Sequence, residues 1–275
     1  MTAPYIDPAD SFLAAMRAAD LAMHTECIEA DGCLHRYRVE GDKHGTLNGW
    51  YVLHAGTPAF GAFGSWRTGQ SHNWSSVKQS TLSDADRRTF AERRDAARSA
   101  RDKALAVELA AAAARALKIW KMSAPVEAHP YLFAKAVRAL GVRQFGDKLV
   151  IPLRDASGMI WSLQFIDQAG NKRFLKYGRK HGNYFSIGLP GEAIVICEGY
   201  ATAASVYMTT GIATAVAFDC GNLKPVAKAL RKKFPLIQIV VAADNDAATP
   251  GNPGLTHALD AARAVGGRVA VPNFA

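Results

Sequence analysis

The sequence predicts an α/β protein whose C-terminal third forms a parallel sheet with flanking helices. Two short apolar runs, Ala193–Cys197 and Leu236–Ala243, have the length and composition of strands buried on both faces of a sheet. Between them the chain has a helix of small residues, another apolar run and a second helical stretch. Alternating strands and helices indicate parallel strands joined by right-handed crossovers.

The remaining elements of this third follow the same alternation. We expect strands over residues 193–197, 214–217, 236–243 and 268–271, and helices over residues 201–209, 223–233 and 255–265.

Carboxylates follow two of these strands. Glu198 comes directly after the first apolar run, and Asp244 and Asp246 come after the second. Ligands of open parallel sheets bind beyond the carboxyl ends of the strands, where these groups would meet. Three carboxylates repel one another unless a cation lies between them, and Mg²⁺ and Mn²⁺ prefer oxygen ligands. The sequence thus predicts a Mg²⁺ or Mn²⁺ site; in the alternative, Glu198 caps a helix and the aspartates form a turn.

The segment before the sheet predicts a mixed α+β subdomain. A short helix is expected over residues 129–140, ended by Gly141, and a hairpin over residues 148–166 turns at Asp155–Gly158. A strongly basic stretch, residues 172–181, then leads to the sheet. Its charges suit a polyanionic ligand, or form an ordinary solvated surface.

The N-terminal part predicts a small helix and antiparallel hairpins. Asp7-Pro8 begins an amphipathic helix, and alternating strands with glycine turns follow from residue 33. The aromatic residues Trp50, Trp66 and Trp74 are interleaved with arginines, which suits single-stranded nucleic acid. These tryptophans alternatively form the core of a small sheet.

A long helix is expected over residues 84–121, capped by Ser83. Its arginine-rich first half is either a solvated face or a surface for phosphates. The chain therefore divides into four predicted segments: an N-terminal unit (1–82), a basic helical linker (83–122), a mixed subdomain (123–190) and the parallel sheet (191–275).

Composition narrows the class of partner. The formal net charge of +9 favours a polyanion, with nucleic acid first. The four cysteines include no CxxC pair, so a zinc ribbon is not supported, and a reducing cytoplasm is expected. No apolar run approaches the ~20 residues of a membrane span, so we expect no membrane association.

The acidic motifs resemble the Toprim domain of bacterial-type DNA primases, topoisomerases and OLD-family nucleases. The resemblance is carried by Glu198-Gly199 after one strand, Asp244-Asn245-Asp246 after another, and Gly254 at the start of the next helix. It implies that the three acids are catalytic and bind metal, and that Glu198 is a ligand or a general base. Many primases have an aspartate shortly after the Glu-Gly pair, whereas this chain has Tyr200, Ala201 and Thr202.

The basic leader is similar to the polymerase core of primases from plasmids and phages. The Pro-Leu-Arg-Asp strand end and the Lys-Tyr segment carry this resemblance. It implies primer synthesis from nucleoside triphosphates on single-stranded DNA, with a helicase domain or replication partner. The residues expected to bind substrate or nucleic acid are Arg154, Arg173, Lys176, Arg179, Lys180 and Asn222, whose loop adjoins the acids. In the alternative, Asn222 caps the helix expected over residues 223–233.

Other functions remain open. A Toprim nuclease would use the same carboxylates against DNA but would not need the basic leader. A non-catalytic module that binds single-stranded DNA would not need all three acids. A topoisomerase needs a tyrosine-bearing domain and a longer chain. The N-terminal unit takes the place of the zinc ribbon of bacterial primases without its cysteine ligands.

Overall fold

The computed structural model describes residues 7–23, 27–77, 84–126, 128–245, 249 and 251–271. The chain divides into two compact units, Met1–Ala104 and Leu105–Ala275.

The first unit is a helix packed on a four-stranded antiparallel sheet. Its elements are α1 (Pro8–Ala18), β1 (His35–Tyr37), β2 (Gly49–His54), β3 (Phe60–Ser65) and β4 (Ser71–Ser75), and the strands pair in chain order. The Asp7 side chain accepts a hydrogen bond from the Ala9 N–H at 2.9 Å, which confirms the predicted cap. Fully buried Phe12 and Met16 pack against Tyr51 and Phe63 in the core.

Helix α2 (Asp84–Met122) begins in the first unit and ends in the second, as the sequence predicts. The predicted cap, Ser83, lies outside the described residues.

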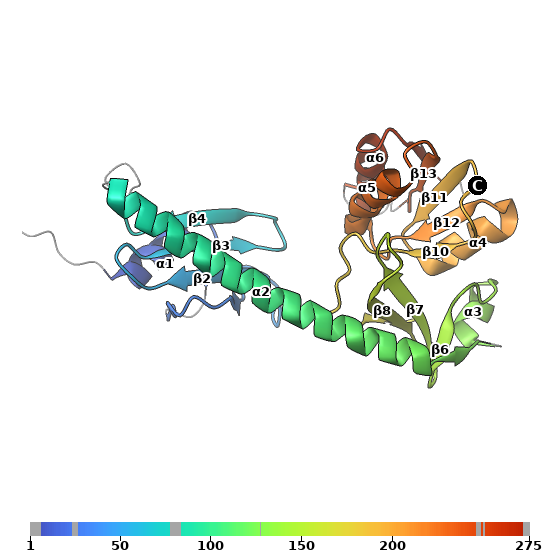
Figure 1. Ribbon diagram of the computed structural model, residues 1–275, viewed down its shortest axis with the longest axis horizontal. Helices are drawn as coiled ribbons and strands as arrows, with labels where there is room; N and C mark the ends of the chain where they lie inside the picture. Colours follow the sequence, from blue (N-terminus) through green and yellow to red (C-terminus); the bar gives the residue numbers. More distant parts are fainter. Residues whose placement is uncertain are drawn as a thin grey trace, which may run out of the picture. The chain divides into compact units, whose positions relative to one another are not determined.

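The second unit contains the predicted parallel sheet (Figure 1). Its strands are β10 (Phe185–Ile187), β11 (Ala193–Cys197), β12 (Ala213–Val216), β13 (Gln238–Ala242) and β14 (Arg268–Ala270). Their spatial order is β10-β12-β11-β13-β14, with β10 antiparallel to β12 and the other neighbours parallel. The strand β10 was not predicted.

Three helices flank the parallel sheet: α4 (Tyr200–Thr210), α5 (Leu223–Lys233) and α6 (Pro253–Arg263). Helices α5 and α6 bury Leu223, Leu230 and Ala258 against one face. On the other face, α4 buries Tyr200 and Ala203. The apolar strand runs are therefore covered on both sides, which confirms the predicted fold class.

A second, antiparallel sheet precedes the parallel one, and we call it the leader sheet. Its strands pair in chain order: β5 (Ala124–Pro125), β6 (Arg143–Phe145), β7 (Lys148–Arg154), β8 (Ile160–Ile166) and β9 (Lys172–Phe174).

The two faces of the leader sheet have different neighbours. Leu149, Ile151 and Leu153 pack in the same core as β11, β12 and α4. Val150 lies on the opposite face, where it packs against Ala116 of α2. Successive side chains of a strand point to opposite faces, so each residue of β7 is assigned to one neighbour or the other.

The helix expected over residues 129–140 is shorter than predicted. Helix α3 spans Pro130–Ala134, Lys135 caps it, and Ala136 has a left-handed backbone with φ 52°. Left-handed residues end helices, so the helix stops well before Gly141.

Among the described residues, none of the helices has the length and apolarity needed to cross a bilayer.

Candidate functional site

Two of the predicted carboxylates lie at the same edge of the parallel sheet. Glu198 follows β11 directly, and Asp244 comes two residues after β13. The two strands are parallel neighbours with Ile196 opposite Val241, so their carboxyl ends coincide. Both acids are half-buried, and we call this pair the acidic edge. The third predicted acid, Asp246, lies outside the described residues.

Backbone hydrogen bonds fix the position of Glu198. The Ala217 N–H donates to the Cys197 carbonyl, and the Phe218 N–H donates to the Glu198 carbonyl, both at 2.8 Å. Phe218 has a left-handed backbone with φ 74°, a conformation that costs free energy for a bulky residue. Gly199 is the N-cap of α4, so the positive end of that helix begins directly after Glu198.

Two thiols respond to the charge of the acidic edge. Burial raises the pKa of Cys197 to about 12, and the negative charge of Asp244 contributes in the same direction. Burial also raises the pKa of Cys220, as do the charges of Glu198 and Asp219. Both cysteines therefore stay protonated at neutral pH.

A lysine that was not predicted reaches this edge. A β-carbon placed on Gly199 would lie 3.8 Å from Lys172 Nζ, so the ammonium is close to the start of α4. Lys172 pairs with Ile166, whose side chain belongs to the core shared with the parallel sheet. The ammonium can therefore neutralise anionic groups that approach Glu198.

The predicted Arg173 lies on the other face of the leader sheet. It pairs with Phe165, which packs with the α2 core, so its side chain points away from the parallel sheet. Arg173 and Lys172 point to opposite faces because of the register of β9 against β8. The basic composition of the segment does not reveal this register.

Lys180 approaches the same region and forms an ion pair with Asp219. Its ammonium lies 5.3 Å from the Phe174 ring centroid, and Phe174 makes an edge contact with Phe218 at 6.0 Å between centroids. Asp219 Oδ1 accepts a hydrogen bond from the Asn222 N–H at 2.9 Å. Asp219 follows a strand of the parallel sheet but was not among the predicted site residues.

The side-chain amide of Asn222 is buried and fully hydrogen-bonded to backbone groups in this region. Its side chain is 2% exposed. Its Oδ1 accepts from the Gly182 N–H at 2.8 Å, and its Nδ2 donates to the carbonyls of Asn183 at 3.0 Å and Ala217 at 2.8 Å. The amide thus joins the basic loop to the end of β12. It does not cap α5 through its side chain.

Two other predicted cations have aromatic neighbours. The Arg179 guanidinium lies 3.6 Å from the Trp161 ring centroid and 3.8 Å from an Asp155 oxygen. Lys176 Nζ lies 4.9 Å from the ring centroid of exposed Tyr177. Such pairs leave part of each cation accessible to phosphates.

Arg154 points away from the acidic edge. Arg154 lies four residues after Val150 on β7, so the two side chains point to the same face of the leader sheet. Its guanidinium carbon lies 5.6 Å from the Trp120 ring centroid in α2. One of its N–H groups donates to the Gly158 carbonyl at 2.9 Å. The structure therefore does not bring Arg154 together with Glu198 and Asp244.

The carboxylate oxygens of the acidic edge fit a hard divalent cation. In the described part of the chain, no third acid, histidine or cysteine joins them in a group whose ligand atoms all lie within 4.8 Å of one another. Asp246, two residues beyond Asp244, is the remaining predicted ligand and lies outside the described residues.

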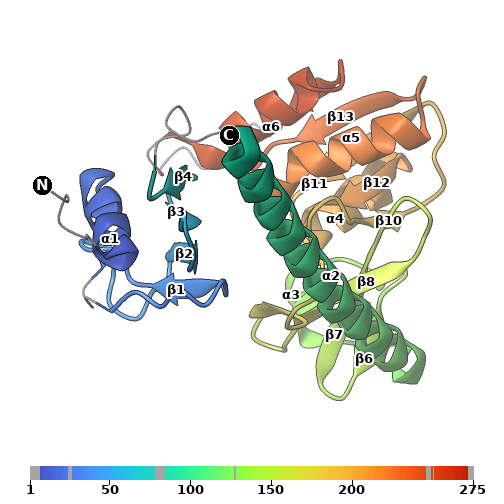
Figure 2. The ribbon, with the colours of Figure 1, turned by 60° about the vertical axis from the view of Figure 1, so that its left-hand side comes forward.

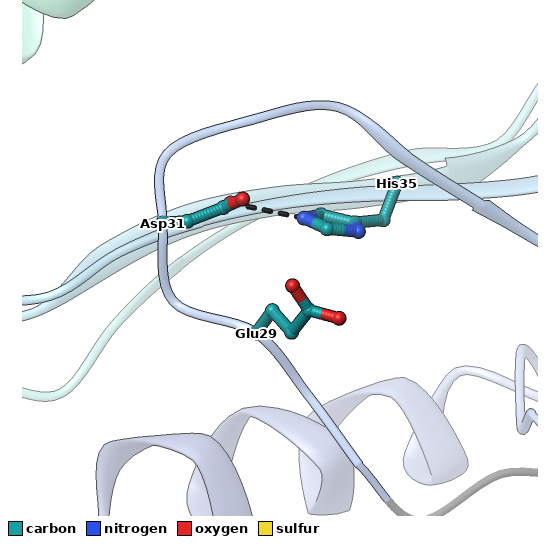
Figure 3. A group of neighbouring side chains, drawn as sticks. All are labelled: Glu29, Asp31 and His35. Atoms are coloured by element: carbon teal, nitrogen blue, oxygen red, sulfur yellow. Dashed lines mark hydrogen bonds and ion pairs between the residues drawn. The ribbon is translucent and has the colours of Figure 1, made fainter.

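The first unit holds a mixed group with metal-ligand spacing. Ligand atoms of Glu29, Asp31 and His35 all lie within 4.8 Å of one another (Figure 3). Asp31 Oδ1 bonds to His35 Nε2 at 2.9 Å and accepts from the Cys33 N–H at 2.8 Å. Both acids are exposed, and these contacts account for the Asp31 carboxylate, so we assign no ion to the group.

The tryptophans of the first unit have different environments. Trp74 packs partly on the core, whereas Trp66 is 51% exposed and carries the Arg36 guanidinium 4.6 Å from its ring centroid. The core alternative thus holds for Trp74, whereas Trp66 lies at the surface.

Comparison with known proteins agrees with the geometry. Residues 192–272 match the family model of the Toprim domain, so this part of the chain is a Toprim domain. The chain is 38% identical to two Escherichia coli proteins named DNA primase TraC, and the alignments cover 99% of it. It spans only 20% and 27% of those relatives. The predicted resemblance to plasmid primases with a Toprim domain is confirmed.

Solved structures of primases are more distant. The primase fragment of the bacteriophage T7 primase-helicase protein is 18% identical, with a TM-score of 0.37, over 48% of this chain and 57% of that one. The Aquifex aeolicus primase, with its zinc-binding and RNA polymerase domains, is 11% identical, with a TM-score of 0.41, over 99% and 80% of the two chains.

Proposed function

We propose that this chain synthesises short primers from nucleoside triphosphates on single-stranded DNA, as a metal-dependent nucleotidyltransferase of plasmid or phage replication. The observation that carries the proposal is the acidic edge of a Toprim domain, approached by Lys172 from the leader sheet. The similarity to DNA primase TraC along 99% of the chain supports the same activity.

The acids would hold the divalent cation. We assign Asp244 and Asp246 as ligands of Mg²⁺ or Mn²⁺, and Glu198 as a further ligand or as the base that would accept a proton from the primer 3′ hydroxyl. When bound, the cation would stabilise the charge that develops on the transferred phosphoryl group.

The lysines would hold the triphosphate. Lys172 lies beside the start of α4, where the helix dipole also favours an anion. Lys180 is half-buried and is paired with Asp219. Triphosphate oxygens that reach this site can replace Asp219 as the partner of Lys180, because a phosphate is also a strong acceptor.

The other basic residues would contact the template. Arg173, Lys176 and Arg179 belong to the basic segment that leads into the Toprim domain. Contacts of this kind are with phosphates, so they would give affinity that falls with salt rather than sequence preference. Exposed Trp66 with Arg36 offers a base-stacking surface in the first unit. A helicase domain or another replication protein would act with this chain.

A priming assay tests the proposal. The assay combines single-stranded DNA, labelled nucleoside triphosphates and Mg²⁺ or Mn²⁺, with Asp244→Ala and Glu198→Ala as controls. Short template-dependent products that are lost in both variants are the expected result. Degradation of the template would instead establish a nuclease, and DNA binding without either reaction would establish a binding module.

A further inference from the structure

A groove on the second unit lies between α2 and the hairpin of β7 and β8. It has a volume of about 560 Å³ and is lined by Leu117, Trp120, Met159, Arg143 and Arg154, among others. In Figure 2 the C-terminal part of α2 passes beside β7 and β8. We call this the α2 groove. It lies on the face of the leader sheet opposite the Toprim domain.

An exposed apolar stripe leads along α2 into the groove. Val107 is 70% exposed and Leu117 is 43% exposed, and exposed Ala110 and Ala114 lie between them. The spacing of three and four residues places all four on one side of the helix. A different side of α2, with Ala112, Ala113 and Ala116, is already buried. Met159, 48% exposed, continues the apolar surface on the hairpin.

Two arginines at the groove have no carboxylate partner among the residues that the structure describes. The guanidinium carbons of Arg143 and Arg154 lie 4.5 and 5.6 Å from the Trp120 ring centroid. Arg143 donates to the Trp120 carbonyl and Arg154 to the Gly158 carbonyl, both at 2.9 Å. In the described ranges neither forms an ion pair.

The surroundings of the two arginines favour an anionic ligand. Burial lowers the pKa of Arg154, and the neighbouring charge of Arg143 lowers it further. Two like charges in a partly desolvated site repel each other, and a carboxylate between them would relieve that repulsion.

The apolar stripe distinguishes among anionic ligands. The phosphates and sugars of a nucleic acid do not pack favourably against exposed aliphatic side chains along a helix, and the bases bind by stacking on aromatic rings. The Trp120 ring already has two guanidinium groups near it. A second copy of this chain carries the same net charge of +9 and would be repelled. An amphipathic helix with acidic side chains satisfies both the stripe and the arginines.

We propose that the α2 groove binds an acidic amphipathic helix of a partner protein. The apolar side chains of that helix would pack against Val107 and Leu117, and its carboxylates would pair with Arg143 and Arg154. Arg154, which the sequence predicted to bind substrate or nucleic acid, is assigned to this groove instead, on the face of the leader sheet opposite the acidic edge.

A fluorescent model peptide of about five helical turns tests the proposal on the full chain. Its leucines follow a three–four spacing and its glutamates flank them, and a matched peptide has glutamine in place of glutamate. Fluorescence anisotropy measures the affinity for each peptide and for an oligothymidylate. The protein variants are Leu117→Glu, Arg143→Gln and the control Leu105→Glu, which alters a leucine that is 51% exposed elsewhere on α2. Thermal melting verifies that each variant is folded.

The expected result has three parts. The acidic peptide binds more tightly than the glutamine peptide, by about 10-fold. Leu117→Glu and Arg143→Gln each weaken its binding by about 10-fold, whereas Leu105→Glu changes it by less than about 2-fold. Leu117→Glu leaves oligothymidylate binding unchanged.

Three results would overturn the proposal. The first is no measurable binding of the acidic peptide. The second is equal binding of the two peptides, which would indicate a nonspecific apolar surface. The third is displacement of the peptide by oligothymidylate together with weaker DNA binding in Leu117→Glu, which would identify a nucleic-acid site.

Discussion

The two faces of the leader sheet carry similar residues but serve different neighbours. On one face, Lys172 and Phe174 approach the acidic edge of the Toprim domain. On the other face, Arg154 and Arg173 point toward the α2 side. Adjacent cations in the sequence are therefore not equivalent, because strand alternation places them on opposite surfaces. A basic segment is best interpreted one residue at a time.

The largest expected effect is at the acidic edge. Asp244→Asn keeps the size of the side chain but removes the charge that would bind the cation. We expect primer synthesis to fall by about 10³-fold, equivalent to about 4 kcal/mol of transition-state stabilisation. The measurement is the initial rate of primer formation at saturating Mn²⁺, with Mn²⁺ affinity measured by titration calorimetry. Unchanged affinity and rate would place the metal elsewhere.

The next effect concerns the junction between the basic loop and β12. Asn222→Ala removes three close hydrogen bonds from a buried amide and leaves backbone groups unpaired. We expect the free energy of unfolding to fall by about 2–3 kcal/mol. Chemical denaturation measures this loss. A stable variant with much weaker binding of single-stranded DNA would instead support the original expectation that Asn222 contacts nucleic acid.

A pair of substitutions tests directly whether neighbouring cations of β9 serve opposite faces of the leader sheet. Lys172→Gln should lower kcat/KM for nucleoside triphosphate by about 10–30-fold, since its ammonium lies beside the acidic edge. Arg173→Gln, the matched change on the opposite face, should lower it by less than about 3-fold. Steady-state kinetics at saturating template, where weaker template binding by Arg173→Gln does not limit the rate, measures both. Equal losses would show that the two faces share one ligand.

The smallest expected effect is in the core beneath α4. Tyr200 is 1% exposed; its hydroxyl accepts from the Leu140 N–H at 2.8 Å and lies 3.0 Å from the Arg138 carbonyl. Tyr200→Phe should lower the free energy of unfolding by about 1 kcal/mol, because the Leu140 N–H loses its partner. Thermal melting checks this value, and primer synthesis at low temperature should be unchanged. A large loss of activity in a stable variant would assign Tyr200 a role in the reaction.

Sequence predicted the elements that local patterns define. The buried strands and the acids after them were identified because an apolar run that ends in a carboxylate is visible in the chain itself. The length of α2 was predicted in the same way, from helix-forming composition.

Of the cations near the acids, Lys180 was predicted from the basic segment, whereas Lys172 was not. Which side chains of β9 face the Toprim domain depends on the register of β9 with β8. The face to which Arg154 points depends on its position along β7, next to a shift in the pairing register between Leu153 and Arg154. Both are set by pairing between strands rather than by local composition. The early end of α3 was not predictable either. The residue with the left-handed backbone is Ala136, whereas glycine and asparagine are the residues that usually indicate such a position.

Primer synthesis by Glu198→Gln tests the central claim most directly. The substitution preserves the side-chain volume next to Gly199 and removes only the carboxylate. A single-stranded template, labelled nucleoside triphosphates and Mn²⁺ should yield short primers with the wild-type chain and, in the folded variant, at least about 100-fold fewer. Wild-type yields from the variant would contradict the assignment of catalysis to this edge of the Toprim domain.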